Sequence, residues 1–103
     1  MRASVLPKKF EEFLISQHVL HLATCQNNIP WAATCFYALD LSEGALIIAS
    51  SLNSRHLREA LELEIIAGSV ALQTEKVSYI EGIQFEGKLK TATKLQKKLY
   101  YKT

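Results

Sequence analysis

The residues best placed to do chemistry in this chain are cationic side chains in the first turn of a predicted helix. Segment 53–61 opens with two residues that can cap a helix and continues with apolar residues at helical spacing. Arg55, His56 and Arg58 fall in its first turn. A helix N-terminus is partly positive, so each exposed cation there costs about 0.3–1 kcal/mol. A bound phosphate would turn that cost into a gain, whereas the alternative is a solvated turn.

Length and composition indicate one modest globular domain. The chain has 103 residues, of which 49% are hydrophobic, and a formal net charge of +2. So small a charge predicts no strong field for nucleic acid or an anionic membrane. No segment reaches the roughly 18 apolar residues that span a bilayer. Residues 1–7 lack the apolar core of a secretory signal, so we expect a cytoplasmic protein.

The two cysteines are predicted to be reduced, small core residues. The segment between them looks like a hairpin connection, which would set Cys25 opposite about Trp31 and Cys35 opposite about His21. The thiols would then lie several residue pairs apart at about 3.3 Å per residue, too far for a disulfide. His21 with Cys35 supplies two potential metal ligands, fewer than zinc requires, so we expect no metal site.

Hydrophobic periodicity divides the chain into helices and strands joined by short turns. The predicted helices are 8–16, 54–63 and 94–101, and the predicted strands are 19–24, 31–39, 45–49, 65–72 and 77–90. Hairpin turns dominate, so the sheet should be mostly antiparallel. We therefore expect a mainly β (α+β) fold, a small barrel of about five strands with short flanking helices.

Several patterns within these elements carry further expectations. Segment 77–90 alternates, which predicts one long strand with a dry and a wet face. Segment 31–39 is apolar on both faces, which indicates a strand buried on both sides or lining a ligand. Trp31 could stack on a ring system, but aromatic residues dominate cores, so we interpret it as core. His18 and His21 are predicted to lie on opposite strand faces as structural residues.

The order of these segments resembles the pyridoxamine-phosphate-oxidase-like, FMN-binding split barrel, and most closely a small, poorly characterised bacterial branch of it. The matching segments are 17–19, 31–37 followed by Asp40, 54–56 and 82–87. The resemblance implies an antiparallel split β-barrel, FMN as cofactor and a homodimer with the flavin between subunits. Members of that family continue past the third helix with another strand. Residues 1–103 should therefore form a single domain that lacks this C-terminal region.

The resemblance places the FMN phosphate at the start of the second helix. Better-known members open this helix with a Ser-Arg-Lys run whose two basic residues hold the phosphate. Here Arg55 matches, while His56 replaces lysine and is charged only part of the time near neutral pH. Ala49 and Ser50 stand at the end of the preceding strand, where an aromatic residue and threonine are usual. The Ser50 hydroxyl can still donate to phosphate.

The resemblance places the flavin ring against the second strand, through backbone groups. The corresponding residues are Thr34, Cys35 and Phe36, in a segment that keeps small and apolar residues but lacks the basic side chains usual near its ends. A glutamine that contacts the ring in the oxidase aligns near Gly82, so that contact is expected to be lost or replaced.

The leading functional hypothesis is an FMN-binding protein, a flavin-dependent oxidoreductase acting on an unknown small molecule. Its chemistry would belong mainly to the cofactor, which agrees with the lack of a Ser-His-Asp motif and of an assignable catalytic residue. The alternative is a non-catalytic dimeric module that binds flavin, heme or another flat ligand. A nucleic-acid-binding barrel would need a basic groove with exposed aromatic side chains, and the aromatic residues here sit mainly at apolar strand positions.

Overall fold

The computed structural model describes residues 6–51 and 53–103. Within these residues, three α-helices, five strands and one 3-10 turn follow one another in the order α1 (Lys8–Ser16), β1 (Val19–Gln26), β2 (Ile29–Asp40), β3 (Ala45–Ile48), α2 (Arg55–Glu62), β4 (Ile66–Ala71), η1 (Val77–Tyr79), β5 (Gly82–Gly87) and α3 (Lys94–Lys102). Residues 1–5, on which part of the signal-peptide expectation rests, lie outside the described range. Among the described residues, no helix is long and apolar enough to cross a membrane.

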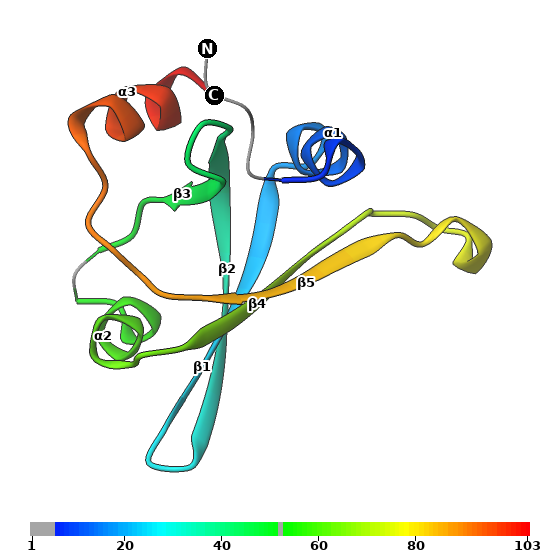
Figure 1. Cartoon of the computed structure of the whole chain (residues 1–103). Coiled ribbons are helices and arrows are strands. Elements are labelled where there is room, and N and C mark those ends of the chain that lie inside the picture. Colours follow the sequence, from blue (N-terminus) through cyan, green and yellow to red (C-terminus); the bar gives the residue numbers. More distant parts are fainter. Residues whose placement is uncertain (1–5, 52) are drawn as a thin grey trace.

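The five strands form one antiparallel sheet in the order β3-β2-β1-β4-β5. β1 and β4 share only the pairs from His21↔Ser69 to Ala23↔Ala67. This short contact lets the hairpin β4–β5 cross β1 and β2 steeply, so the sheet curls into a half-barrel with β3 and β5 at its edges (Figure 1). The expected mainly β, split-barrel-like α+β fold is confirmed.

The hairpin β1–β2 sets the register of the sheet. Asn27 and Asn28 have φ of 53° and 63°, the left-handed region that two-residue hairpin turns require and that asparagine tolerates. The turn is therefore two residues long and tighter than expected. As a result Cys25 lies opposite Pro30 and Cys35 opposite Leu20, one residue from the predicted pairing. Both thiols are free, and the core prediction holds for buried Cys35 but is wrong for exposed Cys25.

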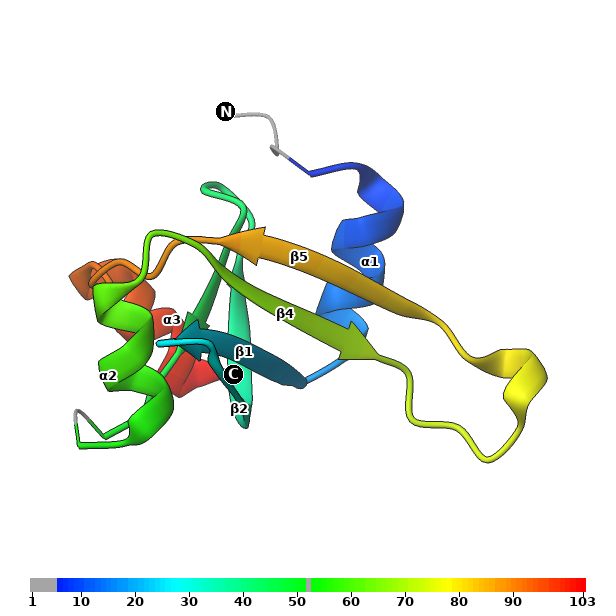
Figure 2. The same cartoon turned by 90° about the horizontal axis from the view of Figure 1, so that it is seen from below.

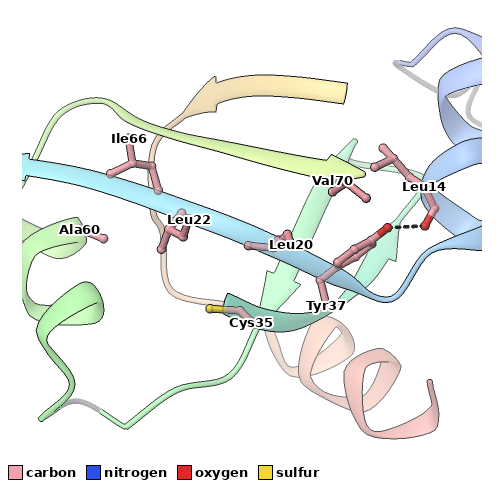
Figure 3. Close-up of a cluster of buried hydrophobic side chains, with 8 residues drawn as sticks. All are labelled: Leu14, Leu20, Leu22, Cys35, Tyr37, Ala60, Ile66 and Val70. Carbon is pink, nitrogen blue, oxygen red and sulfur yellow. Dashed lines mark hydrogen bonds between the residues drawn. The ribbon is translucent and has the colours of Figure 1, made fainter. Parts of the chain in front are cut away.

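The core lies on one face of the sheet and is closed by helices. Along β1, Leu20, Leu22 and Thr24 point inward while the intervening residues are exposed. Leu14 of α1 and Ala60 of α2 pack against this face (Figure 3). The full cluster of buried apolar residues is Leu14, Leu20, Leu22, Cys35, Tyr37, Ala60, Ile66 and Val70. Helices α1 and α2 are thus anchored to the same sheet face.

The predicted long strand 77–90 is wrong at both ends, because β5 covers only Gly82–Gly87. β4 ends at Ala71, which pairs with Gly82, and the backbone N–H of Leu72 donates to the carbonyl of Glu81. A strand extends only as far as its partner, so residues 72–81 form a loop that contains η1. Val77, expected on the dry face, is 89% exposed. This loop projects from the body of the molecule in both views (Figures 1 and 2).

Helix α3 is hydrogen-bonded to the C-terminal end of β2. Thr93 and Gln96 form a capping box, and the Gln96 amide also donates to Asp40 Oδ2 at 3.1 Å. This hydrogen bond and those from Ser42 hold the pKa of Asp40 below its ordinary value. Leu95 of this helix is 78% exposed. The helix also carries a basic, solvent-exposed set of side chains, namely Lys94, Lys97, Lys98 and Lys102.

Candidate functional site

The first turn of α2 begins without a side-chain cap. Ser54 occupies the N-cap position with extended backbone angles, φ −70° and ψ 146°. Its hydroxyl donates to the carbonyl of Ser51 at 2.7 Å and makes no cap hydrogen bond. The N–H groups of this turn therefore have no cap from Ser54, and groups of this kind bind anions.

Three of the predicted site residues meet beside this turn. A hydrogen bond of 2.9 Å joins His56 Nε2 to Ser50 Oγ in a partly buried position. β2 and β3 pair as far as Tyr37↔Ile48, which brings Ser50, two residues on, near Cys35. Burial raises the pKa of the Cys35 thiol, and a hydrogen bond from Ser50 partly offsets that rise. Cys35, Ser50 and His56 thus link the middle of β2 to the start of α2, and Ala49 adjoins them in the chain.

Arg55 is engaged on another side of the helix. Its guanidinium lies over the ring of Trp31, 4.1 Å from the centroid. Its Nε donates to Glu59 Oε2 at 2.9 Å. Glu59 is buried and its Oε1 accepts a hydrogen bond of 2.7 Å from Thr24 on β1. The hydrogen bonds from Thr24 and Arg55 hold the pKa of Glu59 below its ordinary value.

This network contains functional candidates that the sequence prediction missed. Trp31 was expected in the core, but its side chain is 43% exposed and one face of its ring carries Arg55. Thr24 and Glu59 had no predicted role. The four-residue spacing of Arg55 and Glu59 is a signal that could have identified the ion pair, because such positions are neighbours on a helix. The contact with Trp31 depends on how α2 docks on the sheet.

The side chains of Thr34 and Phe36 lie on the face of β2 opposite to Cys35. Thr34 Oγ1 is 3.2 Å from Nδ1 of His21, and Phe36 stacks with His18 at a centroid distance of 5.9 Å. Both histidines therefore contact the same face of β2, which corrects their prediction on opposite faces. Phe36 also meets Tyr100 of α3 edge-on at 6.2 Å. Only the backbones of Thr34 and Phe36 are left to face the cluster around Cys35.

The backbone of β2 presents an open edge at these two residues. The Tyr37 N–H donates to the His18 carbonyl at 2.9 Å, so alternation directs the N–H and C=O groups of Thr34 and Phe36 away from β1. On that side β3 pairs only with residues 37–40. Within the described part of the chain, no strand covers residues 29–36 there. This open edge is next to Cys35 in the chain and can donate and accept hydrogen bonds.

A hollow of about 540 Å³ runs along the flank of α2, beside the end of β1. Both Arg55 and Glu59 line it, and Gln26 Nε2 donates to Glu62 Oε2 at 2.6 Å within it. Two arginines and two glutamates line the hollow, so it favours neither charge. Among the described residues, no group of three or more His, Cys, Asp or Glu could hold a metal ion.

Comparison with known proteins identifies relatives by sequence. No family model and no solved structure matches the chain. It is 36% identical over 77 residues to a UPF0306 protein of Yersinia pestis bv. Antiqua (strain Angola), covering 75% of this chain and 52% of the relative. A UPF0306 protein of Haemophilus ducreyi is 33% identical over 89 residues, 86% of this chain and 61% of the relative. A third UPF0306 protein, from Yersinia pseudotuberculosis serotype O:1b, is 37% identical over 75 residues, which cover 73% of this chain and 51% of the relative.

The chain thus spans about half to three fifths of the length of the curated relatives it matches. These homologues are UPF0306 proteins, an uncharacterised bacterial family, and the chain is similar to them in sequence over about half of their length or somewhat more.

Proposed function

We propose that this chain is an FMN-binding module, and that the protein acts as a flavin-dependent oxidoreductase on an unknown small molecule. The observation that carries the proposal is the hydrogen bond between Ser50 and His56, next to Cys35 of β2. It sets the uncapped first turn of α2, suited to a phosphate, beside the open edge of β2, suited to the hydrogen-bonding end of a flavin ring. One molecule with a phosphate and a flat polar ring would use both features at once.

The residues present fit the two ends of FMN. Ser50 and His56 offer a hydroxyl and an imidazole next to the N–H groups of the α2 turn. The backbone of Thr34 and Phe36 offers donors and acceptors to the ring. Arg55 is the first residue of the same turn, and its permanently charged side chain is long enough to reach a phosphate bound there. When bound, the flavin would supply the redox chemistry, while these groups bind and orient it.

The proposed site extends to a homodimer with the flavin between subunits, as the resemblance to split barrels implies. The open edge of β2 supports this arrangement, because an uncovered strand edge is a surface that another chain can approach. A single copy would then hold only part of the site.

Flavin titration tests the proposal directly. FMN and riboflavin are added separately to the purified protein, and quenching of flavin fluorescence is measured. We expect saturable binding of FMN that is tighter than that of riboflavin, since only FMN carries the phosphate. No saturable FMN binding at concentrations on the order of tens of micromolar would overturn the proposal.

Substitution of Arg55 locates the phosphate. Arg55→Ala should weaken FMN binding by about 1.5–3 kcal/mol, the worth of a charge-assisted hydrogen bond, and leave riboflavin binding unchanged. Arg58→Ala is the matched control, because Arg58 is an exposed arginine of the same turn. Equal losses in both variants would indicate a general charge effect and argue against a phosphate site at Arg55.

The oxidoreductase part needs a separate experiment. NADH or NADPH is added to the FMN-loaded protein without oxygen, and the flavin absorbance is followed. Bleaching is the expected result. An unchanged flavin spectrum with both donors would leave a binding module and remove the proposed reductase activity.

A second candidate is a module for another flat ligand such as heme, on the other face of β2. The stacked pair His18–Phe36 and the edge contact with Tyr100 favour it, because they form an exposed aromatic surface with an imidazole. Hemin titration, read by its absorbance, tests this candidate. Binding that His18→Ala abolishes would support it, and binding unaffected by that change would refute it.

A further inference from the structure

We infer that Trp31 and Glu59 clamp Arg55 away from the phosphate position, so that a phosphate-bearing flavin must open the clamp to bind. This inference rests on the proposed function and adds a selectivity device to it. The clamp consists of the Trp31 ring, the Glu59 carboxylate and the Thr24 hydroxyl that holds the carboxylate.

The Arg55 side chain lies on the flank of α2. Helical side chains lean toward the N-terminus of their helix. Glu59 therefore leans back toward Arg55, and both side chains line the hollow along the flank of α2. The guanidinium is held at this flank by its contacts with Trp31 and Glu59.

The residues of the clamp come from three elements of the fold. The guanidinium stacks on Trp31 at 4.1 Å, and Trp31 pairs across the hairpin with Thr24, the residue that fixes Glu59. The four side chains thus form a closed set that joins β1, β2 and α2. Glu59 is buried and accepts a hydrogen bond from Thr24, so it offers Arg55 a carboxylate already in position.

The Glu59 carboxylate and a bound phosphate would compete for Arg55. The Glu59 carboxylate carries one negative charge, whereas a phosphate monoester carries nearly two near neutral pH and has more acceptor oxygens. A phosphate at the first turn can therefore draw Arg55 away from Glu59. Riboflavin, which has no phosphate, leaves the clamp shut. The clamp would favour phosphorylated flavins and keep the arginine covered when none is present.

Trp31 reports on the clamp, because it is the only tryptophan of the chain. Inorganic phosphate is the probe, since it does not absorb where tryptophan emits. Titration of the wild-type protein with phosphate should give a saturable change in Trp31 emission as the guanidinium leaves the ring. Potassium chloride at matched ionic strength should give none. The change should persist in Arg58→Ala and vanish in Arg55→Ala.

Removal of the competing carboxylate gives the second test. Glu59→Gln keeps the shape of the side chain but weakens the clamp, so FMN should bind about two- to fivefold tighter, the worth of a partly exposed ion pair. Glu62→Gln is the control, because it removes a carboxylate from the same helix that bonds Gln26 and not Arg55. Equal tightening in both variants would indicate bulk charge and overturn the clamp.

The outcomes separate the inference from the proposed function. If FMN binds and depends on Arg55 but Trp31 emission is silent to phosphate, the clamp is refuted and the flavin site stands. If FMN does not bind, the proposed function is refuted, and so is the inference that rests on it. The emission experiment uses the wild-type protein, so it decides the inference even if Glu59→Gln fails to fold.

Discussion

Glu59 is the residue on which the surroundings of Arg55 depend. It lies buried between a β1 hydroxyl and the guanidinium of its own helix, and both partners donate to its carboxylate. A buried carboxylate is tolerated when it is paired and hydrogen-bonded in this way. The same contacts make it sensitive to protonation, because a neutral carboxyl loses the attraction to Arg55.

Acid should weaken the fold through Glu59. Its pKa in the folded chain is below its ordinary value of 4.5, with the Thr24 hydrogen bond as the largest cause and that of Arg55 next. A lowered folded pKa adds stability above the unfolded pKa, and this stability is lost as pH falls from about 4.5 through the folded pKa. Urea unfolding between neutral pH and pH about 3 should show a smaller acid loss in Glu59→Gln and in Thr24→Val than in wild type. Identical slopes would exclude this role.

Tyr37 ties α1 to the sheet through one buried hydrogen bond. Its hydroxyl donates to the Leu14 carbonyl at 2.6 Å, and burial raises the pKa of Tyr37 to about 12 (Figure 3). Tyr37→Phe keeps the ring and should cost about 0.5–1.5 kcal/mol of unfolding free energy, measured by urea denaturation. Tyr101→Phe, on a side chain that is 80% exposed, is the control and should be neutral. An equally stable Tyr37→Phe would contradict the assigned role.

At the scale of elements, the crossing of β1 with the hairpin β4–β5 decides the curl of the sheet. Gly68 of β4 sits at this crossing, paired with Leu22 on one side and Phe85 on the other. A Cβ there would collide with the Phe85 ring and lie 2.8 Å from the His21 carbonyl oxygen. The crossing therefore needs a residue without a side chain at this one position.

Gly68→Ala should consequently destabilise the fold. The carbonyl of His21 belongs to a paired strand and cannot easily retreat, so we expect a loss of about 1–3 kcal/mol in unfolding free energy. Gly87→Ala is the matched control, because a Cβ at Gly87 meets nothing within 4 Å. Thermal or urea unfolding of both variants provides the measurement. Equal stabilities would show that Phe85 moves aside freely.

At the scale of the whole molecule, the sheet is open. The radius of gyration is 14.2 Å, above the roughly 13 Å of a compact chain of this length. The loop 72–81 projects from the body of the molecule and contributes to this larger radius (Figure 2). An open half-barrel leaves strand edges and apolar side chains at the surface, among them Val77 and Ile80 of the loop.

Self-association and FMN binding should promote each other if the flavin lies between subunits. Linkage requires that a ligand bound by the dimer shifts the equilibrium toward the dimer. Sedimentation velocity over a range of protein concentrations should therefore show a larger dimer fraction with FMN than without it. A chain that binds FMN tightly and sediments as a monomer throughout would refute the shared site.

Much of the fold was predictable because local patterns agree with it. The apolar spacing in 8–16 and 54–63, the asparagines of the first hairpin and the alternation of β1 each identify an element. The extent of β5 was not predictable, since alternation runs on from Val77 without indicating where the partner strand ends. The one-residue shift opposite Cys35 arises likewise from the length of a turn.

By itself the sequence determined the order of elements and the antiparallel sheet, because these follow from neighbouring residues. Only the tertiary structure decided what Arg55 contacts. Its stacking on Trp31 and its pairing with a carboxylate held by Thr24 require α2 to dock on the β1–β2 hairpin. The tertiary structure likewise separated the side chains of Thr34 and Phe36 from Cys35, because alternate residues of a strand face opposite sides of the sheet.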